Sequence, residues 1–229
     1  MSVLSSLIIS ILPYAIGAAF SLALLTTQIA AVSYARSPRL ASFSYLFGSI
    51  IFFLIVAFAG MYIGSGLSAV ALGMIHIGAI TEVIIGSVLI IIALKTLILR
   101  EEPRESGILG FITSLRENSG FSIFIKFFYI GFLTFLASFT TDILVLQAGN
   151  IIGLSNPGFT LAAVAVIILG VITLLVVEIP FIAYLIFSTR TGDMLTSTRR
   201  WATNYGDYIT TIVYLILGIF LIIRGFLFI

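Results

Sequence analysis

The sequence contains no cysteine and only one histidine, and this limits the chemistry that it can perform. Without cysteine there is no disulfide, no thiol redox relay and no cysteine-ligated metal site. The single histidine, His76, excludes a histidine-rich metal centre. Phosphate-binding glycine loops, nucleophile elbows and metalloprotease motifs are also absent from the sequence. We therefore expect a protein that is not an enzyme and that has no metal and no cofactor.

Charged residues are scarce as well: they make up 9% of the 229 residues, while 61% are hydrophobic. Soluble domains carry about 25% charged residues, because they must cover a surface that faces water. The composition therefore predicts an integral membrane protein. The formal net charge of +2 does not indicate a nucleic-acid partner, because the basic residues are spread over short loops instead of one face.

Long apolar runs divide the chain into segments of similar length. A spanning helix needs roughly 20 mostly apolar residues, and six segments meet this requirement. They are residues 4–32, 41–63, 74–99, 122–149, 160–188 and 208–228. No Lys or Arg precedes the first segment, so we expect it to remain a membrane helix and not to be a cleaved signal peptide. The predicted fold is an all-α polytopic membrane protein with six transmembrane helices.

The connections between these segments differ in positive charge. Residues 33–40, 100–121 and 189–207 hold eight arginines, which are Arg36, Arg39, Arg100, Arg104, Arg116, Arg190, Arg199 and Arg200. On the opposite side of the membrane the arginine is Arg224, near the C-terminal end. Arginine-rich loops face the cytoplasm by the positive-inside bias. We therefore predict a protein of the cytoplasmic membrane, with these three loops inside and both termini outside.

Two stretches of the sequence resemble each other closely. Gly17–Val32 (GAAFSLALLTTQIAAV) and Gly131–Leu146 (GFLTFLASFTTDILVL) align without gaps and share a Thr-Thr pair at the same position. Weaker matches follow in the same order along the chain, at the glycine pairs Gly48/Gly170 and Gly86/Gly218. The chain therefore resembles two related halves of three helices each.

An odd number of helices in each half has a topological consequence, because the second half must then run inverted through the bilayer. We predict two inverted three-helix repeats, residues 1–99 and 122–229, joined by a charged cytoplasmic hinge at 100–121. Inverted repeats are typical of transporters, whose substrate site lies near the midplane where the halves meet. The pattern thus favours a transporter.

Each of the two matched stretches places polar side chains inside an apolar helix. The residues are Thr26, Thr27 and Gln28 in the first stretch and Thr140, Thr141 and Asp142 in the second. A polar or charged group in a spanning helix is costly, so it tends to face a cavity or a partner. We predict that these residues and Glu178 bind the substrate. Glu178 precedes Pro180, whose ring clashes with the carbonyl of Val176, so we also expect a bend there.

Plainer interpretations of the same residues stay open. Paired threonines often bond back to the carbonyl four residues earlier and serve only packing. An interfacial position would explain Asp142, and an ion pair with Lys126 would explain Glu178. We expect Glu82 to be interfacial, and we expect Arg224 to extend its long side chain to the membrane surface.

Several stretches along the chain have the letters of a known family. They are GAAFSLALL in the first helix, the basic turn Arg36–Arg39, the run IGFLTFLASFTTDILVLQAG, and Arg199-Arg200-Trp201-x-x-Asn204 before LILGIFLIIRG. With these stretches the chain resembles the LysE superfamily of six-helix exporters, and within it the GAP family of Sap, or sulfolipid-1-addressing, proteins. The resemblance covers nearly the whole chain.

The resemblance implies an exporter that moves a lipid-linked or amphipathic small molecule across the cytoplasmic membrane by alternating access. Its partners would be membrane lipids and the amphipathic substrate. A partner membrane protein or a homodimer is a further expectation. A different function class stays open, in which the chain is a non-transporting accessory or scaffold subunit of a membrane complex.

A second alternative concerns the substrate. The run Thr-Thr-Asp-Ile-Leu-Val-Leu also resembles a helix motif of cadmium-resistance transporters in the same superfamily. This resemblance implies a divalent-cation exporter with Asp142 as a ligand. A divalent cation usually needs several oxygen ligands, including more than one carboxylate. Because the equivalent position in the first stretch holds Gln28, an amphiphile is favoured over a cation.

Overall fold

The computed structural model describes residues 3–35, 37–70, 75–98, 120–187 and 191–228, and its regular structure is helical. The helices are α1 (Val3–Ala19), α2 (Leu22–Tyr34), α3 (Pro38–Val70), α4 (Ile75–Ile98), α6 (Gly120–Leu136), α7 (Phe139–Ser155), α8 (Phe159–Phe187) and α9 (Thr191–Phe228). No strand occurs within the described ranges. The predicted all-α fold is confirmed, whereas the predicted hinge lies outside the described residues except for its last two.

Three straight helical stretches are long and apolar enough to cross a membrane, namely Pro38–Gly66, Ala79–Ile98 and Tyr205–Leu227. Three bent pairs meet the same requirement together: Val3–Ala19 with Leu22–Ser33, Phe121–Leu136 with Phe139–Ser155, and Phe159–Leu175 with Val177–Ile186. By length and composition, the described residues therefore contain up to six candidate spans if each bent pair counts as one. The prediction of six apolar segments holds in this sense, but the breaks in the first and fourth segments were not expected.

The bend in α8 has a cause that the sequence reveals. Phe159–Leu175 and Val177–Ile186 enclose an angle of 70°. Pro180 lies inside the helix and lacks the N–H that would bond to the carbonyl four residues earlier, at Val176. The bend predicted next to Glu178 is thus confirmed.

The last helix is longer than its apolar part. α9 begins at Thr191, although residues 189–207 were expected to form a loop. Its apolar span, Tyr205–Leu227, is close to the predicted segment 208–228. Hydropathy detects the part of a helix that is suited to lipid, and it misses a polar extension of the same helix. The prediction of a loop over 191–207 was therefore wrong.

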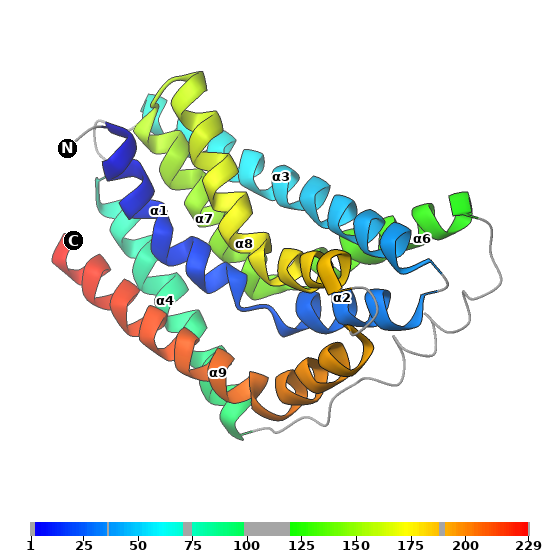
Figure 1. The fold of residues 1–229 in the computed structure, drawn as a ribbon. Coiled ribbons are helices and arrows are strands. Elements are labelled where there is room, and N and C mark those ends of the chain that lie inside the picture. Colours follow the sequence, from blue (N-terminus) through cyan, green and yellow to red (C-terminus); the bar gives the residue numbers. More distant parts are fainter. Residues whose placement is uncertain (1–2, 36, 71–74, 99–119, 188–190, 229) are drawn as a thin grey trace.

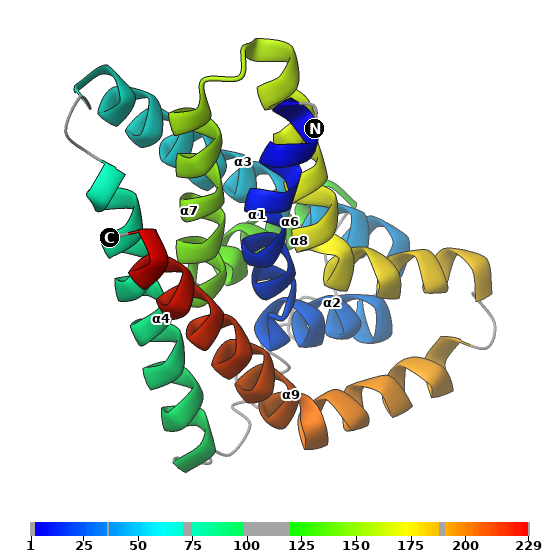
Figure 2. The same cartoon turned by 90° about the vertical axis from the view of Figure 1, so that its left-hand side faces the viewer.

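The helices form two groups that can be followed in both views (Figures 1 and 2). The long α3 packs along α6 and α7, and α1 lies against α7 and α8. The main hydrophobic core lies among these helices, with Tyr14, Phe53, Leu144 and Leu169 fully buried. α4 and α9 run antiparallel and side by side at the edge of the molecule.

Glycines allow α3 and α7 to approach each other closely. Gly60 and Gly64 of α3, and Gly149 and Gly153 of α7, each have the G-x-x-x-G spacing. A Cβ atom added at any of the four would collide with a backbone carbonyl of the other helix, at Leu146, Asn150, Ala57 or Met61 respectively. Such small-residue seams hold membrane helices together, because lipid supplies no hydrophobic drive between them. This seam fixes the position of α7.

A second close contact joins α4 to α9. A Cβ atom added at Gly86 would lie 2.7 Å from the carbonyl oxygen of Gly218, and one added at Gly218 would lie 2.8 Å from that of Gly86. These two glycines are the pair matched in the sequence comparison of the two halves. The division into inverted repeats stays a prediction, and this contact between matched residues is what such a division would produce near the axis relating the halves.

Candidate substrate-binding site at two broken helices

The first predicted span is broken at Phe20 and Ser21, where α1 and α2 meet at 56°. Ser21 is the N-cap of α2, and its Oγ accepts a hydrogen bond from the backbone N–H of Leu24 at 3.5 Å. Serine is a favoured N-cap because its oxygen satisfies a donor that the helix leaves free. The Tyr214 hydroxyl donates to the carbonyl of Phe20 at 3.2 Å. Both sides of this break therefore find partners inside the protein.

The second break lies at Ala137 and Ser138, where α6 and α7 meet at 77°. Ser138 is again the N-cap, but its side chain makes no capping bond. Its hydroxyl donates instead to the carbonyl of Thr134 at 2.8 Å. The first turn of α7 therefore keeps its free N–H groups and contains the carboxylate of Asp142. A negative charge near a helix N-terminus is favoured by the aligned peptide dipoles.

The two breaks are in contact with each other. The Oγ atoms of Ser21 and Ser138 are 3.3 Å apart and share a hydrogen bond. The Thr141 hydroxyl donates to the carbonyl of Ala18 at 3.3 Å, which joins α7 to the end of α1. The structure thus brings the breaks together at one junction, formed by residues far apart in the sequence.

The breaks define a register that differs from the gapless sequence match. Thr26 follows Ser21 by five residues, whereas Thr140 follows Ser138 by two. Aligned on the two serines, the Thr-Thr pairs differ by three residues, which is almost one helical turn. Gln28 and Asp142 are therefore not at equivalent distances from their breaks.

The first polar group, on α2, is buried. Thr26 donates to the carbonyl of Leu22 at 2.8 Å, so for this residue the packing interpretation holds. Thr27 and Gln28 are 1% and 0% exposed, and neither the Thr27 hydroxyl nor the Gln28 amide has a hydrogen-bond partner in the protein. Buried polar groups in proteins are nearly always hydrogen-bonded, so unpaired ones require a ligand, water or a functional reason.

The second polar group, on α7, is less enclosed. Thr140 and Asp142 are half-buried, while Thr141 is 1% exposed. The Oδ1 atom of Asp142 is buried and has no hydrogen-bond partner in the protein. Among the described residues, no hydrogen bond joins this group to Thr27 or Gln28. The two polar groups therefore lie on different helices, each following one of the two breaks.

Glu178 lies on the part of α8 beyond the bend and is half-buried. α8 packs against both α2 and α7, so it is a common neighbour of the two polar groups. The described part of the chain contains no ion pair between Glu178 and Lys126. Of the seven predicted site residues, the structure thus assigns three to α2, three to α7 and one to the helix that contacts both.

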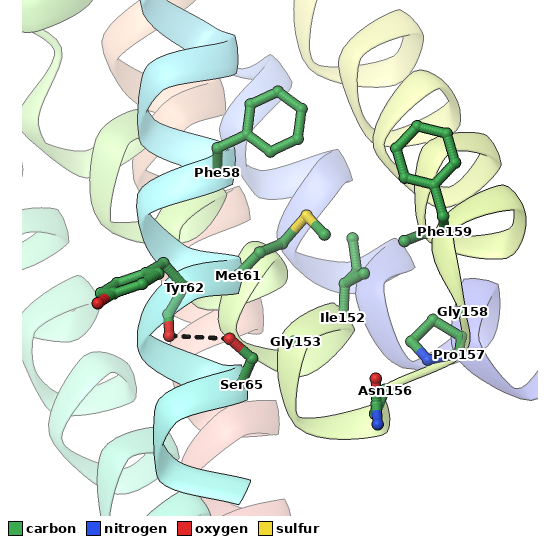
Figure 3. A pocket seen from close by; sticks show the side chains of 11 residues that line it. Phe58, Met61, Tyr62, Ser65, Ile152, Gly153, Asn156, Pro157, Gly158 and Phe159 are labelled. Carbon is green, nitrogen blue, oxygen red and sulfur yellow. Dashed lines mark hydrogen bonds between the residues drawn. The ribbon is translucent and has the colours of Figure 1, made fainter. Parts of the chain in front are cut away.

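An apolar cavity of about 510 Å³ opens between α3, α7 and α8, near the turn that joins α7 to α8 (Figure 3). Phe58, Met61, Tyr62 and Phe159 contribute to its walls, and the buried Ile152 lies at its base. The turn contains Asn156 at φ 40° and Gly158 at φ 80°. This cavity could not be predicted from the sequence, because its lining comes from three segments with no shared motif.

A polar cluster outside the predicted site was also missed. Glu82 is 8% exposed and accepts a hydrogen bond from the Tyr14 hydroxyl at 3.1 Å. Arg224 lies beside it, with Nε 3.5 Å from Oε1 of Glu82. The sequence did not predict that Glu82 and Arg224 pair with each other, while their expected positions near the membrane surface stay predictions. Opposite charges near the ends of two segments were the available signal.

Metal-binding potential is limited within the described residues, which contain no group of three or more His, Asp or Glu side chains. The only histidine of the sequence, His76, has a side chain outside the described part.

The sequence matches one known protein family. A sequence model of the family described as Sap, sulfolipid-1-addressing protein, matches residues 11–226, which is nearly the whole chain. No curated protein and no solved structure matches the chain. The match includes both broken helices, the α4–α9 pair and the cavity, and it bears out the family resemblance of the sequence. The chain belongs to the Sap, or sulfolipid-1-addressing protein, family.

Proposed function

We propose that this protein is an exporter that moves a lipid-linked or amphipathic small molecule across the cytoplasmic membrane by alternating access. The observation that carries the proposal is the junction of two broken helices at Ser21 and Ser138, flanked by buried polar atoms without partners. Transporters commonly build their sites from discontinuous helices, because a break exposes backbone and helix ends inside the membrane. Membership of the Sap family supports a lipid-related substrate.

The residues at the junction would have distinct roles. Asp142 carries the only carboxylate of the two polar groups and lies in the uncapped first turn of α7. It would bind the polar head of the substrate or exchange a coupling proton. Thr27 and Gln28 would donate and accept hydrogen bonds to the same head group when the halves rearrange. Glu178, beyond the bend of α8, would line the path between them.

The apolar part of the substrate needs a different surface. The cavity between α3, α7 and α8 is lined mainly by aromatic and aliphatic side chains, and Phe159 and Tyr62 at its rim are 90% and 81% exposed. Such a surface suits an acyl chain. With both termini outside, as the loop charges indicate, the turn that contains Asn156 would face outward, and the cavity would receive the chain on the side of release.

A flux assay tests the proposal. The purified full chain is placed in proteoliposomes with a fluorescent sulfated glycolipid in one leaflet, and a membrane-impermeant reductant reports how much lipid crosses. We expect movement above that in protein-free vesicles, and a loss of about 100-fold, or ~2.7 kcal/mol of barrier, in Asp142→Asn. Asp207→Asn, which alters an exposed carboxylate of α9, is the matched control.

The assay separates the competing functions. Movement of the glycolipid and of a fluorescent phosphocholine lipid at equal rates would argue against a specific exporter. Absence of flux, together with co-purification with a larger membrane protein at fixed stoichiometry, would favour the accessory subunit. Transport of Cd²⁺ but not of lipid would favour the cation exporter.

A further inference from the structure

The cluster of Tyr14, Glu82 and Arg224 connects three helices that differ in how they are held. α4 packs extensively on α9, and α9 packs in turn on α2, α1 and α8. Among the described helices, α4 has no comparably extensive contact with the core formed by α1, α3, α7 and α8. The hydrogen bond from Tyr14 to Glu82 therefore links α4 to α1 across a boundary with little other packing.

The α4–α9 pair is held together independently of this cluster. Gly86 and Gly218 bring the two helix backbones into close contact, one turn or more from the charged residues along each helix. Glu82 and Arg224 are thus carried on two helices that pack closely on each other, and we call this pair the α4–α9 arm. Tyr14 belongs to the core and is 0% exposed.

Charge makes this connection conditional. The side chains of Glu82 and Arg224 are 10% and 27% exposed, so each charge depends on the other for stabilisation. Both the Tyr14 hydroxyl and the Arg224 Nε lie at the same oxygen, Oε1 of Glu82. One protonation of Glu82 would therefore weaken both contacts at once. Within the described part of the chain, Arg224 on α9 and Tyr14 on α1 are the titratable or charged groups that face this carboxylate.

We propose that Tyr14, Glu82 and Arg224 form a charge lock that ties the α4–α9 arm to α1, and that protonation of Glu82 opens it. Proton uptake converts the carboxylate to a neutral carboxyl group, so Arg224 loses its counter-charge and the hydrogen bond from Tyr14 loses its charged acceptor. The arm is then held less tightly to α1. This lock is separate from the junction of the broken helices. The lock would let the proposed transport cycle respond to protons. Only this role in transport rests on the proposed function.

The absence of native cysteine makes a direct test simple. Ile91→Cys on α4 and Ile167→Cys on α8 introduce labelling sites at side chains that are 64% and 63% exposed. Spin labels at these two positions, in the full chain in nanodiscs, report the distance between the arm and the core by pulsed electron paramagnetic resonance. Because the readout is a distance and not a flux, failure of the lock is distinguishable from failure of the proposed function.

In the spin-labelled protein that keeps Tyr14, Glu82 and Arg224, we expect the distribution of label-to-label distances to shift between pH 8 and pH 5. Glu82→Gln mimics the protonated carboxyl group and should give the pH 5 distribution at both pH values. Because Glu82→Gln leaves Arg224 without a counter-charge and threatens folding, the neutral pair Glu82→Gln/Arg224→Gln serves as a second variant with the same expected result. Tyr14→Phe removes only the link to α1 and should broaden the distribution at pH 8.

Asp207→Asn is the matched control, since it removes an exposed carboxylate of the same arm, and it should keep the shift. The proposal is overturned if the unaltered lock gives one distribution at both pH values. It is also overturned if the neutral double variant keeps the full shift, or if Asp207→Asn abolishes it.

Discussion

The two broken helices share an architecture and differ in chemistry. Both are interrupted for two residues, of which the second is a serine N-cap, and the Oγ atoms of the two serines are 3.3 Å apart. At the first break, Ser21 caps α2 and the polar residues that follow are neutral, with Thr27 and Gln28 almost fully buried. At the second break, Ser138 leaves α7 uncapped and is followed by the half-buried Asp142.

This difference suggests a division of labour at the junction. A capped helix end surrounded by buried neutral groups is suited to holding a fixed geometry. An uncapped end with a carboxylate can bind a charged or hydroxyl-bearing group, or exchange a proton, because its hydrogen-bonding capacity is not used within the protein. We therefore expect substitutions at the second break to lower transport more than substitutions at the first.

The largest expected effect is a difference in lipid transport between a variant of the second polar group and a variant of the first. Asp142→Asn should lower lipid flux by about 100-fold, or ~2.7 kcal/mol of barrier, while Gln28→Met should lower it by less than about tenfold, or ~1.4 kcal/mol. The reason is that only Asp142 can change its charge. Initial rates in the proteoliposome assay measure both, and equal losses would remove the asymmetry between the breaks.

The next largest effect should be a difference in stability between alanine variants at two close helix contacts. Gly149→Ala forces a Cβ atom against the backbone carbonyl of Ala57, whereas Gly17→Ala meets the flexible end of Leu217 at 2.5 Å. Overpacking costs typically 1–3 kcal/mol, so we expect about 3 kcal/mol for Gly149→Ala and about 1 kcal/mol for Gly17→Ala. Unfolding in detergent micelles measures the difference. A greater loss in Gly17→Ala would show that the α3–α7 seam is not the tighter contact.

Removal of an unpaired buried group should raise stability. The Gln28 amide has no partner for either its oxygen or its nitrogen, and methionine has a similar length without the polar atoms. Gln28→Met should therefore raise the free energy of unfolding by about 1 kcal/mol. Thr26→Val is the comparison, because Thr26 already bonds to Leu22 and should change stability little. Destabilisation by Gln28→Met would mean that the amide is paired in the membrane.

The smallest expected effect is a difference in stability between the alanine variants of the two serines. Ser21→Ala removes the cap of α2, and because the capping bond is long we expect a loss of about 0.5–1 kcal/mol. Ser138→Ala removes a hydrogen bond to the carbonyl of Thr134 within its own chain segment and should cost ~0.3 kcal/mol. Both variants also lose the hydrogen bond that the two serines share, so this loss does not affect their order. Thermal unfolding of the two variants side by side checks the order, which reverses if Ser138 is the more important cap.

The sequence predicted the helical class, the apolar segments and the bend near Pro180, because hydropathy and proline act locally. It did not predict the breaks at Ser21 and Ser138, because a break of two residues hardly changes the mean hydropathy of a segment of roughly 20 residues. The seam of Gly60 and Gly64 has a recognisable spacing, but spacing does not identify the partner helix. The pairing of Glu82 with Arg224 depends on which helices become neighbours, and composition contains no such information.

The same dependence on tertiary packing explains which features of the candidate site the sequence did not predict. The residue types at the polar groups were visible in the sequence, and their assignment to helices followed from the apolar runs. Their register relative to the breaks was not visible, so Gln28 and Asp142 were treated as equivalent positions. The hydrogen bonds of Thr26 and Thr141 then distinguish an intrahelical role from an interhelical one. Only tertiary packing supplies that distinction.

Cross-linking of the two breaks tests the central claim most directly. The chain has no native cysteine, so Ser21→Cys/Ser138→Cys introduces a single pair at the junction, where the hydroxyl oxygens are 3.3 Å apart. We predict rapid intramolecular disulfide formation on oxidation in membranes, and a block of lipid flux that reduction reverses. The control pair Ser21→Cys/Ser155→Cys, with cysteines on α7 and at the first break, should not cross-link. Failure of the junction pair to cross-link, or full flux through the cross-linked protein, would contradict the account.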